Sequence, residues 1–326
     1  MRLSRTAAGG GPLALRPLRH ALLATGLVLA VCALLATTAA VSFATTAERI
    51  ATATGRTLGV VDGPADDSAD GGPAVRLRWT PPGAAERVDV VAVGGPAPAA
   101  GTRAEVAFDP ADPSAPLVPG AQVLVDGDRW LTVLSLAVVV AVGVLGALAW
   151  QITVRRRAFA RPVRTARVRR VRWQQGLWTR SYLETESNPQ RWIPVHFDPV
   201  LVGLPAPTTV RLHGDPLRDR VVAATVTGPD GVHPLVPSGP VRLTEPRGHR
   251  TDNPSRPDDT VGQRAAALAR MARQLRADLP LVVPAPFLAL LWTYVDRGGV
   301  LTWASATALT AALGLWLGAL RGSDPS

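Results

Sequence analysis

The chain contains no lysine and only one cysteine, although 35 of its 326 residues are basic. All of the basic residues are therefore arginine, and the abundance of Ala, Val, Gly and Pro beside them is typical of a high-GC bacterial genome. Because a disulfide needs two cysteines, none forms within the chain, and a zinc site built on cysteines is excluded as well. Cys32 lies inside an apolar stretch and is interpreted as a small apolar filler.

The sequence also lacks the spacings that mark catalytic and metal sites. Four of the five histidines, His196, His213, His233 and His249, lie 16 to 20 residues apart, whereas zinc ligands usually come in closely spaced pairs. No Gly-x-Ser-x-Gly motif and no glycine-rich phosphate loop accompanies them. We therefore predict no catalytic residue, no cofactor and no metal site. An enzyme would require the carboxylates and histidines of residues 180–250 to converge in a pocket.

Long uncharged stretches, in contrast, are present at residues 21–47, 130–154, 279–295 and 298–320. A bilayer core about 30 Å thick is crossed by roughly 20 helical residues, so these four stretches predict four transmembrane helices. The first stretch follows several arginines and would also suit a secretory signal peptide. The apolar region of a signal peptide is usually only about 7–15 residues long, which favours an uncleaved span, but the sequence leaves cleavage open.

The last two stretches form a hairpin, because only residues 296–299 separate them. Three prolines within residues 280–286 crowd the start of its first arm, where proline is tolerated near a helix N-terminus but kinks a helix at its middle. A re-entrant hairpin that does not cross the membrane fully is the alternative. In the second arm Gly314 and Gly318 form a Gly-x-x-x-Gly step, which predicts the close approach of another helix.

Charge is distributed unevenly between the two large loops. Residues 48–129 carry seven arginines against twelve acidic residues, whereas residues 155–278 carry 22 arginines against eleven. Because arginine-rich segments beside a span stay in the cytoplasm, we predict that residues 155–278 and both termini are inside and residues 48–129 outside. The predicted location is a bacterial plasma membrane, which the chain crosses several times.

Both large loops show the pattern of small β domains. Short β-rich runs alternate with Gly-Pro, Pro-Pro-Gly and Asp-Pro turns, which predicts an antiparallel sheet or barrel outside and a second barrel or sandwich inside. The predicted outer strands are residues 57–61, 75–79, 88–93, 104–108 and 122–125. The predicted inner strands are residues 168–174, 178–184, 192–197, 208–212, 221–226 and 241–244.

The outer segment contains Val106–Pro113, with the sequence Val-Ala-Phe-Asp-Pro-Ala-Asp-Pro, shortly before the second apolar stretch. A strand that ends in an aromatic-Asp-Pro-x-Asp/Asn-Pro turn between two spans resembles a large family of bacterial integral membrane proteins with a domain of unknown function. The resemblance covers about residues 20–155. It implies the architecture of span, small extracytoplasmic β domain and span, and it brings no activity and no site residue.

Arginine gathers on both flanks of the inner segment. Residues 155–172 contain nine arginines directly after the second apolar stretch. This run fits a stop-transfer flank that leads into an arginine-rich strand, or binding to anionic lipid headgroups, which is worth about 1 kcal/mol per arginine. Nucleic-acid binding is not expected, because no nucleic-acid motif accompanies the run. The candidate headgroup-binding residues are Arg155, Arg156, Arg157, Arg161, Arg273 and Arg276.

Residues 260–278 predict an amphipathic helix, which begins at a capping box formed by Thr260 and Gln263. Its apolar positions share one face, and its arginines lie largely elsewhere. A basic helix of this kind, placed before a membrane hairpin, fits a position along the cytoplasmic interface or packing against the inner β domain.

The predicted fold class is a membrane α-helical protein with four spans and two small, mainly-β domains, one on each side of the membrane. No charge lies inside a predicted span, so the mark of an ion pathway is missing. We expect a non-enzymatic scaffold or partner-binding component of the cell envelope, whose partners are anionic lipid, unidentified proteins or a second copy of the chain. An accessory subunit of a transport or secretion system is the alternative. The predicted segments are an N-terminal tail (1–20), span 1 (21–47), outer β domain (48–129), span 2 (130–154), inner β domain (155–244), linker (245–259), juxtamembrane helix (260–278), span 3 (279–295), span 4 (298–320) and C-terminal tail (321–326).

Overall fold

The computed structural model describes residues 16–65, 73–176, 178–228, 231–256, 258, 260–268, 270–296 and 298–326. Most of the predicted N-terminal tail and one residue of the predicted hairpin turn lie outside these ranges. The chain divides into two compact units, which are described separately below. One comprises residues up to 31 together with 141–326, and the other comprises residues 32–140.

Two long helices contribute residues to both units. They are α1 (Arg16–Thr52), with 37 residues, and α2 (Gln122–Phe159), with 38 residues. Together with α6 (Val300–Arg321) they are long and apolar enough to cross a membrane. Because roughly 20 residues suffice for a crossing, α1 and α2 are both longer than the bilayer core requires.

The third predicted span is a bent pair of helices instead of one continuous helix over residues 279–295. Helix α4 (Met271–Asp278) runs into the short helix η3 (Leu279–Leu281), and α5 (Ala285–Asp296) follows at a bend of 44°. With twelve residues α5 is too short to cross a bilayer alone. Residues 271–281 and α5 taken together are long and apolar enough for one span. The bend falls between Pro280 and Pro286, where proline rings remove backbone donors from the helix.

The predicted juxtamembrane helix is also divided, into α3 (Val261–Leu268) and α4. Arg270 precedes α4 in an extended conformation, with φ −65° and ψ 132°. The backbone oxygen of Leu268, at the end of α3, accepts a hydrogen bond of 3.0 Å from the Arg16 guanidinium. That bond satisfies one of the carbonyls that a helix end leaves without a partner, so α3 can stop there.

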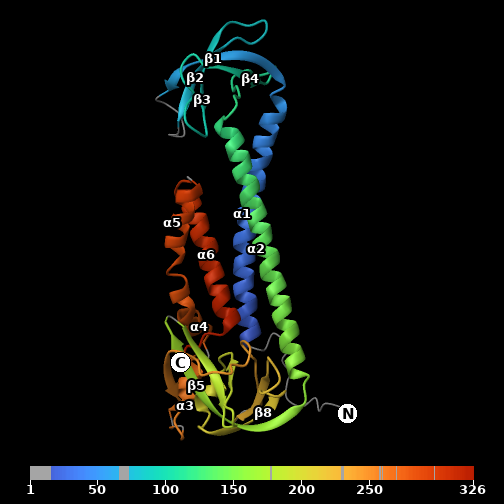
Figure 1. Cartoon of the computed structure of the whole chain (residues 1–326), viewed down its shortest axis with the longest axis vertical. Coiled ribbons are helices and arrows are strands. Elements are labelled where there is room, and N and C mark those ends of the chain that lie inside the picture. Colours follow the sequence, from blue (N-terminus) through green and yellow to red (C-terminus); the bar gives the residue numbers. More distant parts are fainter. Residues whose placement is uncertain are drawn as a thin grey trace. The chain divides into compact units, whose positions relative to one another are not determined.

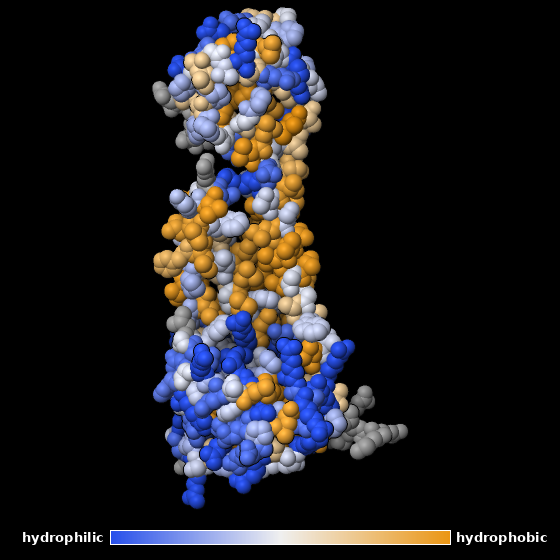
Figure 2. Space-filling view, viewed as in Figure 1, coloured by the Kyte–Doolittle hydropathy of each residue, from blue (hydrophilic) through white to orange (hydrophobic). Residues whose placement is uncertain are grey.

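The last two helices form a hairpin in which α5 and α6 lie side by side (Figure 1). The indole nitrogen of Trp303 donates to the backbone oxygen of Pro286 at 3.0 Å. Figure 2 shows hydrophobic residues gathered over the helices, and hydrophilic residues over the sheet that follows α2. The large apolar side chains exposed on α5 are Phe287, Leu288, Leu290, Leu291, Trp292, Tyr294 and Val295.

The smaller unit contains a four-stranded antiparallel sheet with the order β3-β2-β1-β4. Four predicted outer strands are therefore present, but the fifth, at residues 122–125, is wrong, because these residues form the first turn of α2. Their Gln-Val-Leu-Val pattern is compatible with either structure, and the apolar helix that follows extends back through them. The strands are β1 (Gly55–Ala65), β2 (Ala74–Trp79), β3 (Arg87–Ala92) and β4 (Arg103–Phe108).

The core of this unit lies on one face of the sheet. Trp79 and Phe108 contact each other across it, with ring centroids 5.1 Å apart, and the indole of Trp79 donates to Asp89 at 2.7 Å. Gly59 is required by this packing, since a Cβ there would lie 2.8 Å from Val106. The buried residues are Val61, Val75, Leu77, Trp79, Val91, Val93, Val106, Phe108, Val118 and Ala121.

The larger unit contains a single seven-stranded antiparallel sheet, not the two sheets of a sandwich. The strand order is β10-β9-β8-β5-β6-β7, and β11 pairs with β5. The strands are β5 (Val163–Gln175), β6 (Trp178–Thr185), β7 (Trp192–Val195), β8 (Thr208–His213), β9 (Ala223–Gly228), β10 (Gly231–Leu235) and β11 (His249–Asp252), with a short helix η2 (Pro199–Gly203) after β7.

Two inner predictions are corrected. Residues 241–244 form no strand, and only an isolated bridge joins Arg242 to Trp192. Residues 245–259, predicted as a linker, contain β11, which pairs with residues 171–174 of β5. The central strand β5 thus pairs with β6 along one edge, and with β8 and then β11 along the other. The core on one face consists of Val168, Leu183, Ile193, Val195, Leu201, Leu204, Val210, Leu212, Val222, Ala224, Val226 and Leu235.

Candidate functional site

Helix α4 and its continuation η3 bury polar side chains and expose apolar ones. Gln274 and Asp278 are buried, whereas Leu275, Leu279 and Val283 are 45%, 54% and 61% exposed. These three apolar residues recur every four positions, so they form one stripe along the outside of this segment. A segment surrounded by water would present the opposite arrangement.

The buried carboxylate of Asp278 faces His20 of α1. The His20 Nε2 atom lies 3.0 Å from the Asp278 Oδ2 atom, with side-chain exposures of 7% and 0%. In the described part of the chain no hydrogen bond to a further side chain reaches this carboxylate. A buried charge is costly without a partner, so the imidazole is the group that accommodates Asp278 here.

Gly314 and Gly318 of α6 make room for this segment. A Cβ at Gly318 would lie 2.7 Å from Asp278 Oδ1, and one at Gly314 would lie 2.7 Å from the backbone oxygen of Leu281. The structure therefore places both glycines against the α4–η3 segment of the same chain. Their close contact is made inside the protein.

Gln274 joins α4 to the residues that follow α6. Its amide nitrogen donates to the backbone oxygen of Ser323 at 2.8 Å and to the Ser323 hydroxyl at 2.6 Å. Its amide oxygen accepts from Arg16 at 3.3 Å. Because Arg16 also bonds Leu268, the starts of α1 and α4 and the end of α6 are tied by one set of polar contacts.

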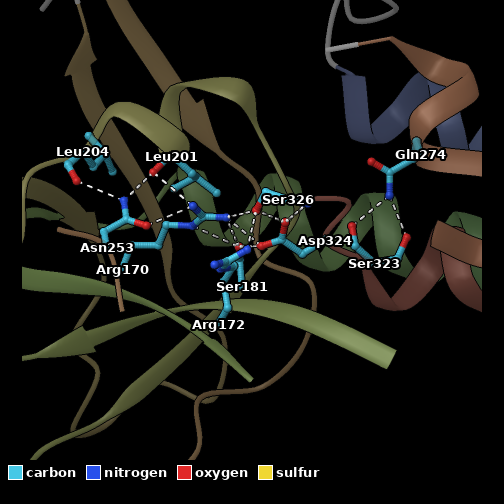
Figure 3. A network of polar contacts seen from close by, with 10 residues as sticks. All are labelled: Arg170, Arg172, Ser181, Leu201, Leu204, Asn253, Gln274, Ser323, Asp324 and Ser326. Atoms are coloured by element: carbon cyan, nitrogen blue, oxygen red, sulfur yellow. Dashed lines mark hydrogen bonds and ion pairs between the residues drawn. The ribbon is translucent and has the colours of Figure 1, made fainter. Parts of the chain in front are cut away.

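The segment after α6 then forms polar contacts with side chains of the seven-stranded sheet, as Figure 3 shows. Asp324 lies 2.7 Å from the guanidinium of Arg170 on β5 and accepts a hydrogen bond from the Ser181 hydroxyl on β6. Arg170 also donates to Ser326 at 2.8 Å and to the side-chain oxygen of Asn253 at 3.1 Å. The amide of Asn253 in turn donates to the backbone oxygens of Leu201 and Leu204.

This network shifts the titration of both charged groups. Burial works to raise the pKa of Asp324, but the Arg170 charge and the hydroxyls of Ser181 and Ser326 outweigh it and hold the pKa below its ordinary value. Burial lowers the pKa of Arg170, against the opposing influence of Asp324. An arginine stays charged even so. The pair is therefore a buried ion pair with hydrogen bonds to its remaining polar atoms.

A third polar contact joins the end of α2 to the sheet. Arg155 is buried and donates to His196 Nε2 at 2.7 Å, to the backbone oxygen of Leu320 at 3.3 Å and to Gln151. Because the guanidinium can only donate, His196 Nε2 accepts and the ring proton resides on Nδ1. Burial, reinforced by the charge of Arg155, lowers the pKa of His196 well below its ordinary value, so the imidazole is neutral.

The predicted headgroup arginines separate into three groups. Arg155 is buried in the contact just described, and Arg161 pairs with Asp219 at 3.4 Å and donates to the Val221 backbone oxygen. Arg156 and Arg157 are exposed on the last turn of α2. Arg273 and Arg276 are brought together at the edge of a cavity of about 570 Å³, together with Arg264 and Arg270.

The arginine run itself is largely engaged inside the unit. Residues 155–159 belong to α2 and residues 163–175 to β5, so a helix flank leads into an arginine-rich strand. Five of its nine arginines form ion pairs with carboxylates: Arg161, Arg164, Arg167, Arg169 and Arg170.

Sequence reasoning missed four residues of these contacts: His20, Asp278, Arg170 and Asp324. The first two lie immediately outside the uncharged stretches, a position that could have identified them, because ionisable residues at span ends need partners. Nothing local marks Arg170 and Asp324, which are 154 residues apart in the chain.

The fold and its contacts define a class: a helical protein with membrane-length apolar helices joined to β-sheet domains. No family model matches the chain, and no curated protein and no solved structure matches it. Within the described residues no three His, Cys, Asp or Glu side chains gather in a group suited to a metal ion. Several of the contacts described above join helix ends to the seven-stranded sheet.

Proposed function

We propose that the chain is a scaffold of the bacterial plasma membrane that binds a protein partner through its four-stranded sheet. In this proposal α1, α2, the bent pair and α6 cross the membrane. The seven-stranded sheet and both termini lie in the cytoplasm, and the four-stranded sheet lies outside. The charge balance of the two large segments supports this orientation, since arginine exceeds acid in residues 155–278 and acid exceeds arginine in residues 48–129.

The observation that carries the proposal is a set of exposed aliphatic residues on the face of the four-stranded sheet opposite its core. Leu58 and Val60 on β1 and Val88 and Val90 on β3 are exposed, at 70%, 37%, 57% and 51%. Val60 and Val88 stand in one row across the sheet, on either side of Arg78. Paired side chains of neighbouring strands share a face, so the four aliphatic residues lie on one face, as two pairs on either side of β2.

This surface is suited to contact with another protein. Exposed apolar residues gathered on one face mark interaction sites in soluble domains, whereas single exposed ones need no explanation. Charged side chains border it, because Arg103 pairs across the sheet with Val60 and Glu105 with Leu58. Arg76 and Arg78 of β2 lie between the two aliphatic pairs. Arginine is enriched at protein interfaces, so aliphatic residues interleaved with arginines are compatible with one.

A photoreactive amino acid at position 88 tests the proposal in intact cells. We expect one discrete protein adduct from Val88, and we expect the double substitution Val60→Glu and Val88→Glu to abolish co-purification of that adduct's partner. Val163→Glu with Val232→Glu is the matched control, because both valines are exposed on strands of the other sheet. Adducts with lipid alone, or a partner retained by the Val60 and Val88 variant, would refute the scaffold.

The alternative of an accessory transport subunit loses part of its support. That alternative relied partly on Gly314 and Gly318 of α6 as a surface on which a helix of another protein could pack. Both glycines already contact the α4–η3 segment of the same chain.

A further inference from the structure

Four arginines line one cavity beside helices α3 and α4. Arg264, Arg270, Arg273 and Arg276 border a space of about 570 Å³, and among the described residues no acidic side chain lines it. Arg264 is paired with Asp258. The other three form no side-chain hydrogen bond and no ion pair within the described residues, and all three are exposed. Three unneutralised cations around one cavity create a site for an anion.

The exposed apolar stripe of α4 and η3 begins one helical turn from the cavity. Ala272 and Arg276 line the cavity, and Leu275 and Leu279 of the stripe follow each of them by three positions. Val283 continues the stripe towards α5. Arginine side chains reach to the polar surface of a membrane while their stems and the neighbouring leucines remain in its apolar part. The same few residues therefore present cations to a polar group and hydrocarbon to an apolar one.

We propose that Arg270, Arg273 and Arg276 bind the phosphate of an anionic phospholipid, whose acyl chains lie along Leu275, Leu279 and Val283. This inference rests on the membrane location in the proposed function. The shared chemistry is phosphate recognition by arginine, which binds phosphate through two parallel hydrogen bonds per guanidinium. The apolar stripe selects the lipid over free phosphate, because only a lipid supplies hydrocarbon to cover the leucines.

The full chain in a neutral detergent tests the proposal directly. The protein is offered phosphatidylglycerol and phosphatidylcholine in equal amounts, and native mass spectrometry measures the ratio of the two lipids that stay bound. We expect phosphatidylglycerol to be retained preferentially. Each arginine replaced by glutamine should weaken that preference roughly fivefold, so that Arg270→Gln, Arg273→Gln and Arg276→Gln together remove it.

The matched control removes the same charge elsewhere. Arg211→Gln, Arg218→Gln and Arg256→Gln alter three exposed arginines that do not line the cavity, and the lipid preference should persist. A preference that survives the first triple substitution, or that the control loses equally, overturns the proposal. Displacement of the lipid by inorganic phosphate, an acidic peptide or an RNA oligonucleotide overturns it in favour of that ligand. The single substitution Arg273→Gln serves if the triple variant does not fold.

Failure of this site is distinguishable from failure of the membrane location. Alkaline extraction of cell membranes leaves an integral protein in the pellet whatever its lipid preference. A wild-type chain that stays in the pellet but shows no preference for phosphatidylglycerol refutes the headgroup site alone. A wild-type chain released by alkali refutes the membrane location as well.

Discussion

Replacing Asp324 by alanine leaves the guanidinium of Arg170 buried without its counterion, at a side-chain exposure of 2%. Removal of one partner of a buried ion pair costs about 3–5 kcal/mol, because the remaining charge is uncompensated. We therefore expect Asp324→Ala to lower the free energy of unfolding of the seven-stranded domain by about that amount. Chemical unfolding of the full chain in detergent, followed by tryptophan fluorescence, measures it.

Glu186 provides the control for this prediction. It pairs with Arg167 and Arg169, whose side chains are 66% and 50% exposed. Ion pairs at the surface contribute about 0–1 kcal/mol, so Glu186→Ala should have a small effect. Equal losses from Asp324→Ala and Glu186→Ala would show that the Arg170 contact does not stabilise the domain.

Acid should destabilise the domain in two stages. The pKa of His196 is lower in the folded chain than its ordinary value of 6.5. The stability that the neutral imidazole contributes is therefore complete above pH 6.5 and declines as the pH falls below 6.5. Asp324 also has a lowered pKa, and its contribution is lost only as the pH falls below about 4, near the ordinary value for aspartate. The midpoint of thermal unfolding, measured from pH 8 to about pH 2, should decline from about pH 6.5 downward.

His196→Gln separates the two stages. Glutamine keeps an acceptor for Arg155 but does not titrate, so the decline that begins near pH 6.5 should be absent while the decline below about pH 4 remains. An unchanged profile in this variant would assign the first stage to a different group.

At the scale of elements, Gly318 controls how closely α4 and η3 approach α6. Alanine in place of glycine ordinarily stabilises a helix interior by up to about 1 kcal/mol. At Gly318, however, the added Cβ would lie 2.7 Å from the Asp278 carboxylate, which is fully buried. We expect Gly318→Ala to lower the thermal midpoint of the chain, because the segment must move away from α6 and from His20.

Gly146 of α2 is the control for the glycine substitution, since a Cβ there meets nothing within 4 Å. Gly146→Ala should leave the thermal midpoint unchanged or raise it. If both alanine variants behave alike, the close approach at Gly318 is not a determinant of the hairpin.

The strands differed in how well the local sequence pattern predicted them. Residues 75–79 alternate apolar and polar residues between clear turns, and they are present as β2. Strand β11 has the polar sequence His-Arg-Thr-Asp and no alternation, so only its pairing with β5 makes it a strand. Residues 122–125 were misassigned because a short apolar run has no periodicity of its own.

The polar contacts escaped prediction for a different reason. Arg170 and Asp324 are ordinary charged residues in the sequence, and they become significant only because folding places the residues after α6 beside β5. In contrast, Arg273 and Arg276 were predicted from their position before a span, and the structure adds the cavity and the two further arginines beside them. Local composition identifies the arginine-rich flanks of a span. Contacts between residues far apart in the sequence can be identified only once the fold is known.

At the scale of the whole chain, the ends of several helices are tied into the larger unit by side-chain bonds. Arg155 at the end of α2 contacts His196, Gln274 of α4 contacts Ser323, and Asp324 beyond α6 contacts Arg170. Each of these groups is buried, and breaking any contact would leave a polar group without a partner. Helices α4, α5 and α6 and the seven-stranded sheet should therefore unfold together in one cooperative transition.

The orientation proposed for the membrane is tested by labelling cysteines from outside the cell. Cys32→Ala removes the only native thiol, after which Ala84→Cys and Ser255→Cys each introduce one exposed thiol, in the four-stranded and the seven-stranded unit respectively. Because residues 155–278 carry the excess of arginine, a membrane-impermeant maleimide should label position 84 in intact cells and position 255 only after lysis. Labelling of both positions in intact cells would refute the proposed sidedness, and labelling of position 255 alone would reverse it.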